Sequence, residues 1–186
     1  MIIRLFDIKT QLGIKGNYLL TRPIARQFVQ SIHLIIEQQS KNDEPIEFSY
    51  EGIQSADTSF IDELIVINIL EKMKKKILSH RGILFSHLTP STLENARSVF
   101  LVKKIPITVK ESDDKEQLIG HLEQNLKKVL HLLWEKKELK TVDLTKRLHV
   151  TKSVASTKLS ALYNKHLALR KEEITAKGRE YTYFSL

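Results

Sequence analysis

The sequence predicts an α/β fold, a mixed sheet with helices packed on it, followed by a smaller α+β unit. The first observation is that strand-like and helix-like segments alternate through residues 1–110, an order that favours parallel strand pairs and right-handed crossovers. The second is that residues 111–186 begin with a long amphipathic helix and end in two alternating strands. The stretch 101–117 lacks a clear helical period, so the division between the two units is expected near residue 111.

In the first unit the elements are predicted from the spacing of apolar residues and from residues typical of helix starts. Ile46, Phe48 and Tyr50 alternate with polar residues, the period of a half-buried strand. Thr21 can cap the first helix, and Pro23 suits its first turn. Apolar residues at intervals of three or four mark the helices. We therefore expect strands over 1–8, 45–53 and 82–89, and helices over 23–39, 59–76 and 91–100.

The second unit has the order of a winged helix-turn-helix. Leucines at helical spacing predict a helix over 116–136. Thr141 is expected to cap a second helix, with Asp143 favoured by the dipole of its first turn. Thr151 is expected to cap a third helix, and two strands follow around a turn at Gly178. Two helices joined by a turn and followed directly by two strands form a DNA-binding arrangement.

The third helix presents a face suited to DNA. Ala155, Leu159 and Leu162 recur at intervals of three or four and are expected to pack inward. The outward strip would then consist of small hydroxyl residues and one cation, namely Lys152, Ser153, Ser156, Thr157 and Ser160. Short polar side chains allow a helix to approach base edges and phosphates closely in the major groove.

Charge supports this placement. The chain carries a net charge of +8, and residues 144–171 contain seven cations and no acidic residue. We expect DNA contacts from Lys152, Ser153, Ser156, Thr157, Lys158, Lys177 and Arg179. A homodimer is expected, because one short helix rarely supplies enough affinity. The alternative is that this unit docks a protein instead of double-stranded DNA.

Residues 143–170 resemble the helix-turn-helix of bacterial winged-helix repressors of the MarR and ArsR type. The match rests on the apolar residues Leu148, Val150, Ala155, Leu159, Leu162 and Leu167. The resemblance implies that Lys152, Ser153, Ser156 and Thr157 contact DNA. His149 and His166 stand where those families usually carry glycine, and histidine tolerates the left-handed backbone better than most residues.

The first unit resembles STAS-like domains related to bacterial anti-sigma-factor antagonists. The matching residues are Gly16, Thr21, Arg22, Gly52, Ser59, Phe60, Asp62 and Glu63. The resemblance implies a sensory or protein-interaction role. In the antagonists a serine at this helix start is phosphorylated, which implies Ser59 as the acceptor. Phe60 replaces the glycine that follows there, and its bulk argues against access by a kinase.

The segment 57–63 also has two other interpretations. Ser59 or Asp57 can cap the helix, and Asp62 and Glu63 complement the dipole of its first turn. Alternatively Asp62 or Glu63 pairs with Arg22, or binds a partner. Arg22, Ser59, Asp62 and Glu63 are therefore candidate regulatory or partner-binding residues.

Other functions find little support in the sequence. Cysteine is absent, the seven histidines lack metal-binding spacing, and no phosphate-binding loop or GxSxG motif occurs. We expect no catalytic activity, no metal and no cofactor. No apolar run approaches the roughly 18 residues of a membrane span, so the expected location is the cytoplasm, without membrane association.

Overall fold

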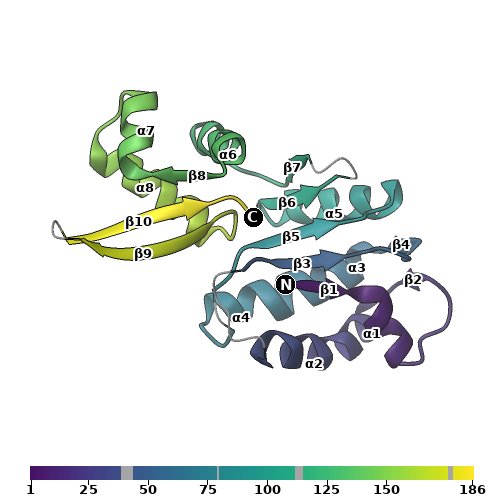
Figure 1. Ribbon diagram of the computed structural model, residues 1–186. Coiled ribbons are helices and arrows are strands. Elements are labelled where there is room, and N and C mark those ends of the chain that lie inside the picture. Colours follow the sequence, from purple (N-terminus) through teal and green to yellow (C-terminus); the bar gives the residue numbers. More distant parts are fainter. Residues whose placement is uncertain (39–43, 79, 112–114, 176–177) are drawn as a thin grey trace.

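The computed structural model describes residues 1–38, 44–78, 80–111, 115–175 and 178–186. The chain is mixed α/β, with a mixed parallel and antiparallel sheet, as the sequence predicts (Figure 1). The strands are β1 (Ile2–Arg4), β2 (Tyr18–Leu19), β3 (Ile46–Ser49), β4 (Ser55–Ala56), β5 (Ile83–Ser86), β6 (Ile107–Lys110), β7 (Glu116–Ile119), β8 (Glu138–Lys140), β9 (Leu169–Thr175) and β10 (Gly178–Phe184). The helices are α1 (Leu5–Gln11), α2 (Arg22–Gln38), α3 (Thr58–Ile61), η1 (Asp62–Leu70), α4 (Glu71–Lys74), α5 (Pro90–Val102), α6 (Gln124–Lys136), α7 (Thr141–Leu148) and α8 (Lys152–Asn164).

The larger sheet has the strand order β1-β3-β5-β6-β7. Its first four strands are parallel, and β7 runs antiparallel to β6. The register aligns Ile3, Phe48, Phe85 and Val109 in one row across the parallel strands. All four side chains are buried, because one face of each strand packs into the core with the helices.

The helical segment after β4 is continuous but changes its winding. A short α-helix, α3, leads into the π-helical segment η1 and then into α4. Most residues of η1 are buried, because it packs against α2 and its apolar side chains belong to the larger hydrophobic core. The wider turn of a π-helix changes which neighbouring residues share a face, and π-helical segments are frequent at functional sites.

The second unit has its own small core and an antiparallel sheet of order β8-β10-β9. The core is built by α6, α7 and α8 over the sheet, with Leu133, Leu144, Leu159 and Tyr183 fully or nearly fully buried. In Figure 1 this unit lies beside the ends of β5 and β6, and the C-terminus lies close to those strand ends. Leu186 accordingly packs next to Gly82.

Three expectations about elements were wrong. The predicted strand 1–8 ends at Arg4, because Leu5 and Ile8 are buried on one face of α1. The predicted helix 116–136 begins only at Gln124, since residues 116–119 form β7. β6 and β7, on either side of the predicted division at residue 111, are therefore partners in one sheet.

The third correction concerns helix starts. Thr89 caps α5, accepting a hydrogen bond from the backbone N–H of Thr92, so the helix predicted from residue 91 begins one residue earlier, at Pro90. Thr21, expected to cap α2, precedes it with a backbone φ of 76°, which is not the extended conformation of an ordinary cap residue. Thr141, expected to cap α7, is the first residue of that helix, and Lys140 occupies the cap position.

Candidate functional site

Helix α8 begins at a well-formed cap. The Thr151 side chain accepts a hydrogen bond from the Val154 N–H at 3.3 Å, as the sequence predicts. Ala155, Leu159 and Leu162 are buried, which fixes the face that α8 turns toward α6 and α7. The preceding turn is closed by His149, whose φ of 51° and ψ of 41° are left-handed.

The opposite face of α8 is polar and accessible. Lys152, Ser153 and Thr157 are exposed, and Ser156 and Lys158 are half-buried. Val154 adds a side chain that is 42% exposed between the polar residues. Ser160 does not belong to this face, because its hydroxyl hydrogen-bonds the Tyr183 hydroxyl at 3.0 Å.

The basic residues around α8 differ in their partners. Lys146 and Arg147 are exposed on α7. The Arg170 guanidinium instead lies over the rings of Tyr163 and Tyr181, at 4.2 and 4.5 Å from their centroids. This stacking holds Arg170 against its own unit.

The hairpin of β9 and β10 carries acids as well as cations. Arg179 is exposed and ion-paired with Glu172 at 3.3 Å. Glu173 lies 3.7 Å from the Lys140 ammonium. Lys177, the other cation expected at the tip, lies outside the described residues. The hairpin is therefore less basic than the adjoining helix face.

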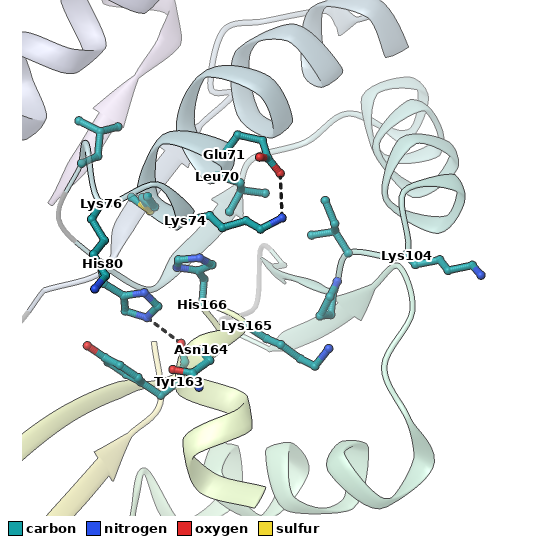
Figure 2. Close-up of a pocket in the computed structure, with 14 residues that line it drawn as sticks. Leu70, Glu71, Lys74, Lys76, His80, Lys104, Tyr163, Asn164, Lys165 and His166 are labelled. Atoms are coloured by element: carbon teal, nitrogen blue, oxygen red, sulfur yellow. Dashed lines mark hydrogen bonds and ion pairs between the residues drawn. The ribbon is translucent and has the colours of Figure 1, made fainter. Parts of the chain in front are cut away.

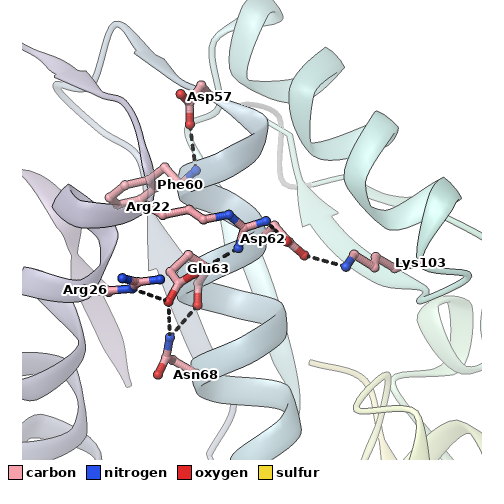
Figure 3. Close-up of polar contacts among 8 residues, drawn as sticks. All are labelled: Arg22, Arg26, Asp57, Phe60, Asp62, Glu63, Asn68 and Lys103. Carbon is pink, nitrogen blue, oxygen red and sulfur yellow. Dashed lines mark hydrogen bonds and ion pairs between the residues drawn. The ribbon is translucent and has the colours of Figure 1, made fainter.

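A second polar cluster joins the starts of α2 and α3. The Asp57 carboxylate caps α3 by accepting from the Phe60 N–H at 2.6 Å (Figure 3). It also accepts from the Thr21 N–H at 2.9 Å. Asp57 is thus the cap, and Ser59 is a half-buried residue in the first turn. One carboxylate thereby fixes two chain segments far apart in sequence.

Next to this cap, Arg22 bridges two buried carboxylates. Its guanidinium donates to Asp62 at 2.6 Å and to Glu63 at 2.9 Å (Figure 3). Pairing of Arg22 with Asp62 or Glu63 was one of the alternatives that the sequence left open. Two further cations contribute that the sequence analysis did not single out: Arg26 donates to Glu63 at 2.9 Å, and Lys103 lies 3.1 Å from Asp62.

These contacts favour the charged forms of Glu63 and Arg22. Hydrogen bonds from Arg26 and then Arg22 hold the pKa of Glu63 below its usual range. The hydrogen bonds of Glu63 and Asp62 raise the pKa of Arg22. A carboxylate so fully paired is a poor general base, because proton uptake would break its hydrogen bonds. The cluster is better suited to positioning than to proton transfer.

A shallow pocket of about 260 Å³ lies beside the cluster. Arg22, Ser59, Asp62 and Lys103 contribute its polar side, and Val102 its apolar side. Val102 is 79% exposed and its neighbour Leu101 62% exposed at the end of α5. The candidate regulatory residues therefore adjoin an exposed apolar edge.

The residues that the structure describes offer neither a metal-binding cluster nor a membrane-spanning helix. No group of three His, Cys, Asp or Glu residues is placed to hold a metal ion there. In the same part of the chain, no helix has both the length and the apolar character needed to cross a bilayer.

No protein-family model matches the chain, and a search of curated proteins found no match either.

Proposed function

We propose that the chain is a DNA-binding transcription regulator. Residues from α6 to β10 would act as a winged helix-turn-helix domain, and the larger sheet with its helices as a STAS-like sensory or protein-interaction domain. The observation that carries the proposal is the exposed, acid-free face at the start of α8. The order of one helix, a short strand, two further helices and a two-stranded hairpin agrees with this interpretation.

The proposed roles follow from side-chain chemistry. Lys152 would pair with a phosphate, and Ser153, Ser156 and Thr157 would donate or accept at base edges or phosphates. Val154 is exposed on the same turn and can contact a thymine methyl group. Lys158, half-buried, and Arg179, paired with Glu172, would contribute at the periphery. Lys177 remains a sequence-based prediction.

A homodimer would place two such helices on two half-sites. The proposal includes no catalytic activity, because the charged cluster of the first unit is internally paired.

A mobility-shift assay on fragments of the source genome tests the proposal. Lys152→Glu with Lys158→Glu should abolish the shift, because reversing two cations on α8 repels the phosphate backbone. Lys15→Glu with Lys75→Glu changes the net charge equally at exposed positions of the first unit and should leave the shift in place. A shift on no fragment, or equal loss in both double variants, would contradict DNA binding through α8.

A second function is favoured by one observation, the exposed Val102 edge beside Ser59 and Asp62. In that case the chain would be a protein-interaction switch whose second unit docks protein. Val102→Asp would then release a co-purifying partner while the chain stays folded. Leu34→Asp, at a side chain 49% exposed on α2 of the first unit, is the matched control. Retention of the partner by both variants would contradict this alternative.

A further inference from the structure

A pocket of about 580 Å³ lies where the two units meet (Figure 2). One wall comes from α4 and the chain that follows it, and the other from the C-terminal end of α8. Its volume falls within the range of about 300–1,000 Å³ typical of small-molecule sites. The size and the position between two units are both typical of a ligand site.

Hydrogen bonds across the junction hold the two walls together. His80 Nε2 donates to the backbone oxygen of Tyr163 at 2.7 Å, and His166 Nδ1 donates to that of Arg81 at 2.8 Å. The rings of His80 and His166 stack with centroids 4.3 Å apart, as Figure 2 shows. The backbone N–H of Ile83 also donates to the His166 oxygen at 3.0 Å. Backbone hydrogen bonds and stacked histidine rings therefore hold the walls of the pocket in place.

The charges at the pocket are mainly positive. Four lysines line it: Lys74, Lys76, Lys104 and Lys165. Glu71 is the acidic residue of the lining within the described chain, and it is paired with Lys74 at 3.6 Å. Burial lowers the pKa of His80 and takes that of His166 to about 4, so both rings are neutral at pH 7. The lysines therefore give the pocket lining its net positive charge.

The inner surface is apolar. Leu70, Met73, Leu78 and Pro106 line the pocket and are buried, and the half-buried Ile105 completes this side. A fully hydrated inorganic ion would gain little from such a surface, whereas an organic molecule would release water from it. The lining therefore combines an apolar floor with a cationic rim.

We propose that this pocket binds a small organic anion, with a carboxylate, sulfonate or phosphate group at the lysines and an aromatic or other apolar body against the floor. The Lys165 ammonium, at the end of α8, and Lys74, at the end of α4, approach the ligand from the two units. The ligand would therefore hold the junction closed. This inference does not depend on DNA binding by the chain.

A pair of fluorescent probes that differ in one group tests the proposal. The anion 8-anilinonaphthalene-1-sulfonate should bind the full chain saturably at one site, with fluorescence enhancement. Lys165→Glu should weaken its affinity at least tenfold, and Lys74→Glu should weaken it in the same direction. N-phenyl-1-naphthylamine, which lacks the sulfonate, should change by less than twofold in either variant.

The control variant is Lys15→Glu, which makes the same charge change at an exposed residue of another surface. It should bind the sulfonate probe like the original chain, and circular dichroism checks that each variant stays folded. Non-saturable binding of the sulfonate probe would overturn the proposal. So would equal affinity in Lys165→Glu and Lys15→Glu, or an equal loss for both probes. Since no DNA is present, none of these outcomes bears on the proposed function.

Discussion

Replacing Asp57 by alanine should destabilise the first unit through two backbone donors at once. The carboxylate accepts from the Phe60 N–H at 2.6 Å, as the cap of α3, and from the Thr21 N–H at 2.9 Å, just before α2. Alanine can accept neither bond, so both helix starts lose their shared anchor.

The magnitude follows from the two contacts. Loss of a helix cap costs about 1 kcal/mol. The bond to Thr21 is exposed and can be replaced by water, so its loss adds about 0.5–1 kcal/mol. The free energy of unfolding should therefore fall by about 2 kcal/mol, which lowers the Tm by about 4–8 °C in a chain of this length.

Thermal unfolding followed by circular dichroism measures this change, with Ser59→Ala as the matched control. Ser59 lies in the same turn but does not cap α3, so its substitution should change the free energy of unfolding by less than about 0.5 kcal/mol. Equal losses in the two variants, or no loss in Asp57→Ala, would refute the assignment of Asp57 as the cap.

Three further predictions concern the backbone and pH. His149→Gly should raise the free energy of unfolding by about 0.5–1 kcal/mol in denaturant titrations, because glycine adopts a φ of 51° without strain; destabilisation would contradict this. Gly120→Ala should lower the free energy of unfolding by well over 2 kcal/mol, since an added Cβ would lie 2.0 Å from the Ile105 oxygen. Gly13 is also left-handed but faces open space, so Gly13→Ala should lower it by only about 1 kcal/mol. Similar losses in the two variants would refute the clash at Gly120. The pKa of His166 is lowered from 6.5 to about 4, so the unfolded chain binds more protons than the folded chain between these pH values. The free energy of unfolding, at its full value above pH 6.5, should therefore fall by about 2 kcal/mol between pH 7 and pH 5. His166→Gln should remove this pH-dependent loss, and a pH profile that the substitution leaves unchanged would contradict the prediction.

The features of the second unit that were predicted correctly have local signals. Thr151 caps α8 and Asp143 lies in the first turn of α7, both within one turn of the residues they influence. His149 and His166 adopt the left-handed conformation at the positions where the resembled families carry glycine, a conformation that histidine tolerates. Local hydrogen bonds and a regular apolar period can be read directly from sequence.

The wrong start of α6 was predicted because the spacing of its apolar residues also fits the strand that precedes it. Leu118 and Leu122 continue the spacing of α6 toward the N-terminus, yet Leu118 belongs to β7 and pairs opposite Thr108. These residues form a strand because they pair with the edge of β6, which lies further away along the chain than one helical turn. A strand that forms for the sake of a neighbouring strand has only a weak signal in its own sequence.

The polar cluster was predicted in part. Arg22, Asp62 and Glu63 stood out because they are charged residues at two helix starts. Arg26 and Lys103 were missed, since an exposed cation on a helix looks the same in sequence whether or not it has a partner. The π-helical turn at residue 62 could not be anticipated either, because its causes lie in packing.

The junction pocket had no signal in the sequence. It depends on contacts between residues more than 80 positions apart, such as His80 with Tyr163 and Arg81 with His166. Each of those histidines is unremarkable in its own segment. Only the tertiary arrangement places their rings in a stack and the lysines around a common cavity.

The salt dependence of DNA binding tests the central claim most directly. Fluorescence anisotropy on a shifted fragment should give an affinity that falls steeply with salt, with a log–log slope of about −5 for roughly six phosphate contacts. Lys152→Gln should reduce the magnitude of that slope by about 0.9 and weaken binding about eightfold at 0.1 M salt. A slope near zero, or one that Lys152→Gln leaves unchanged, would contradict DNA binding through α8.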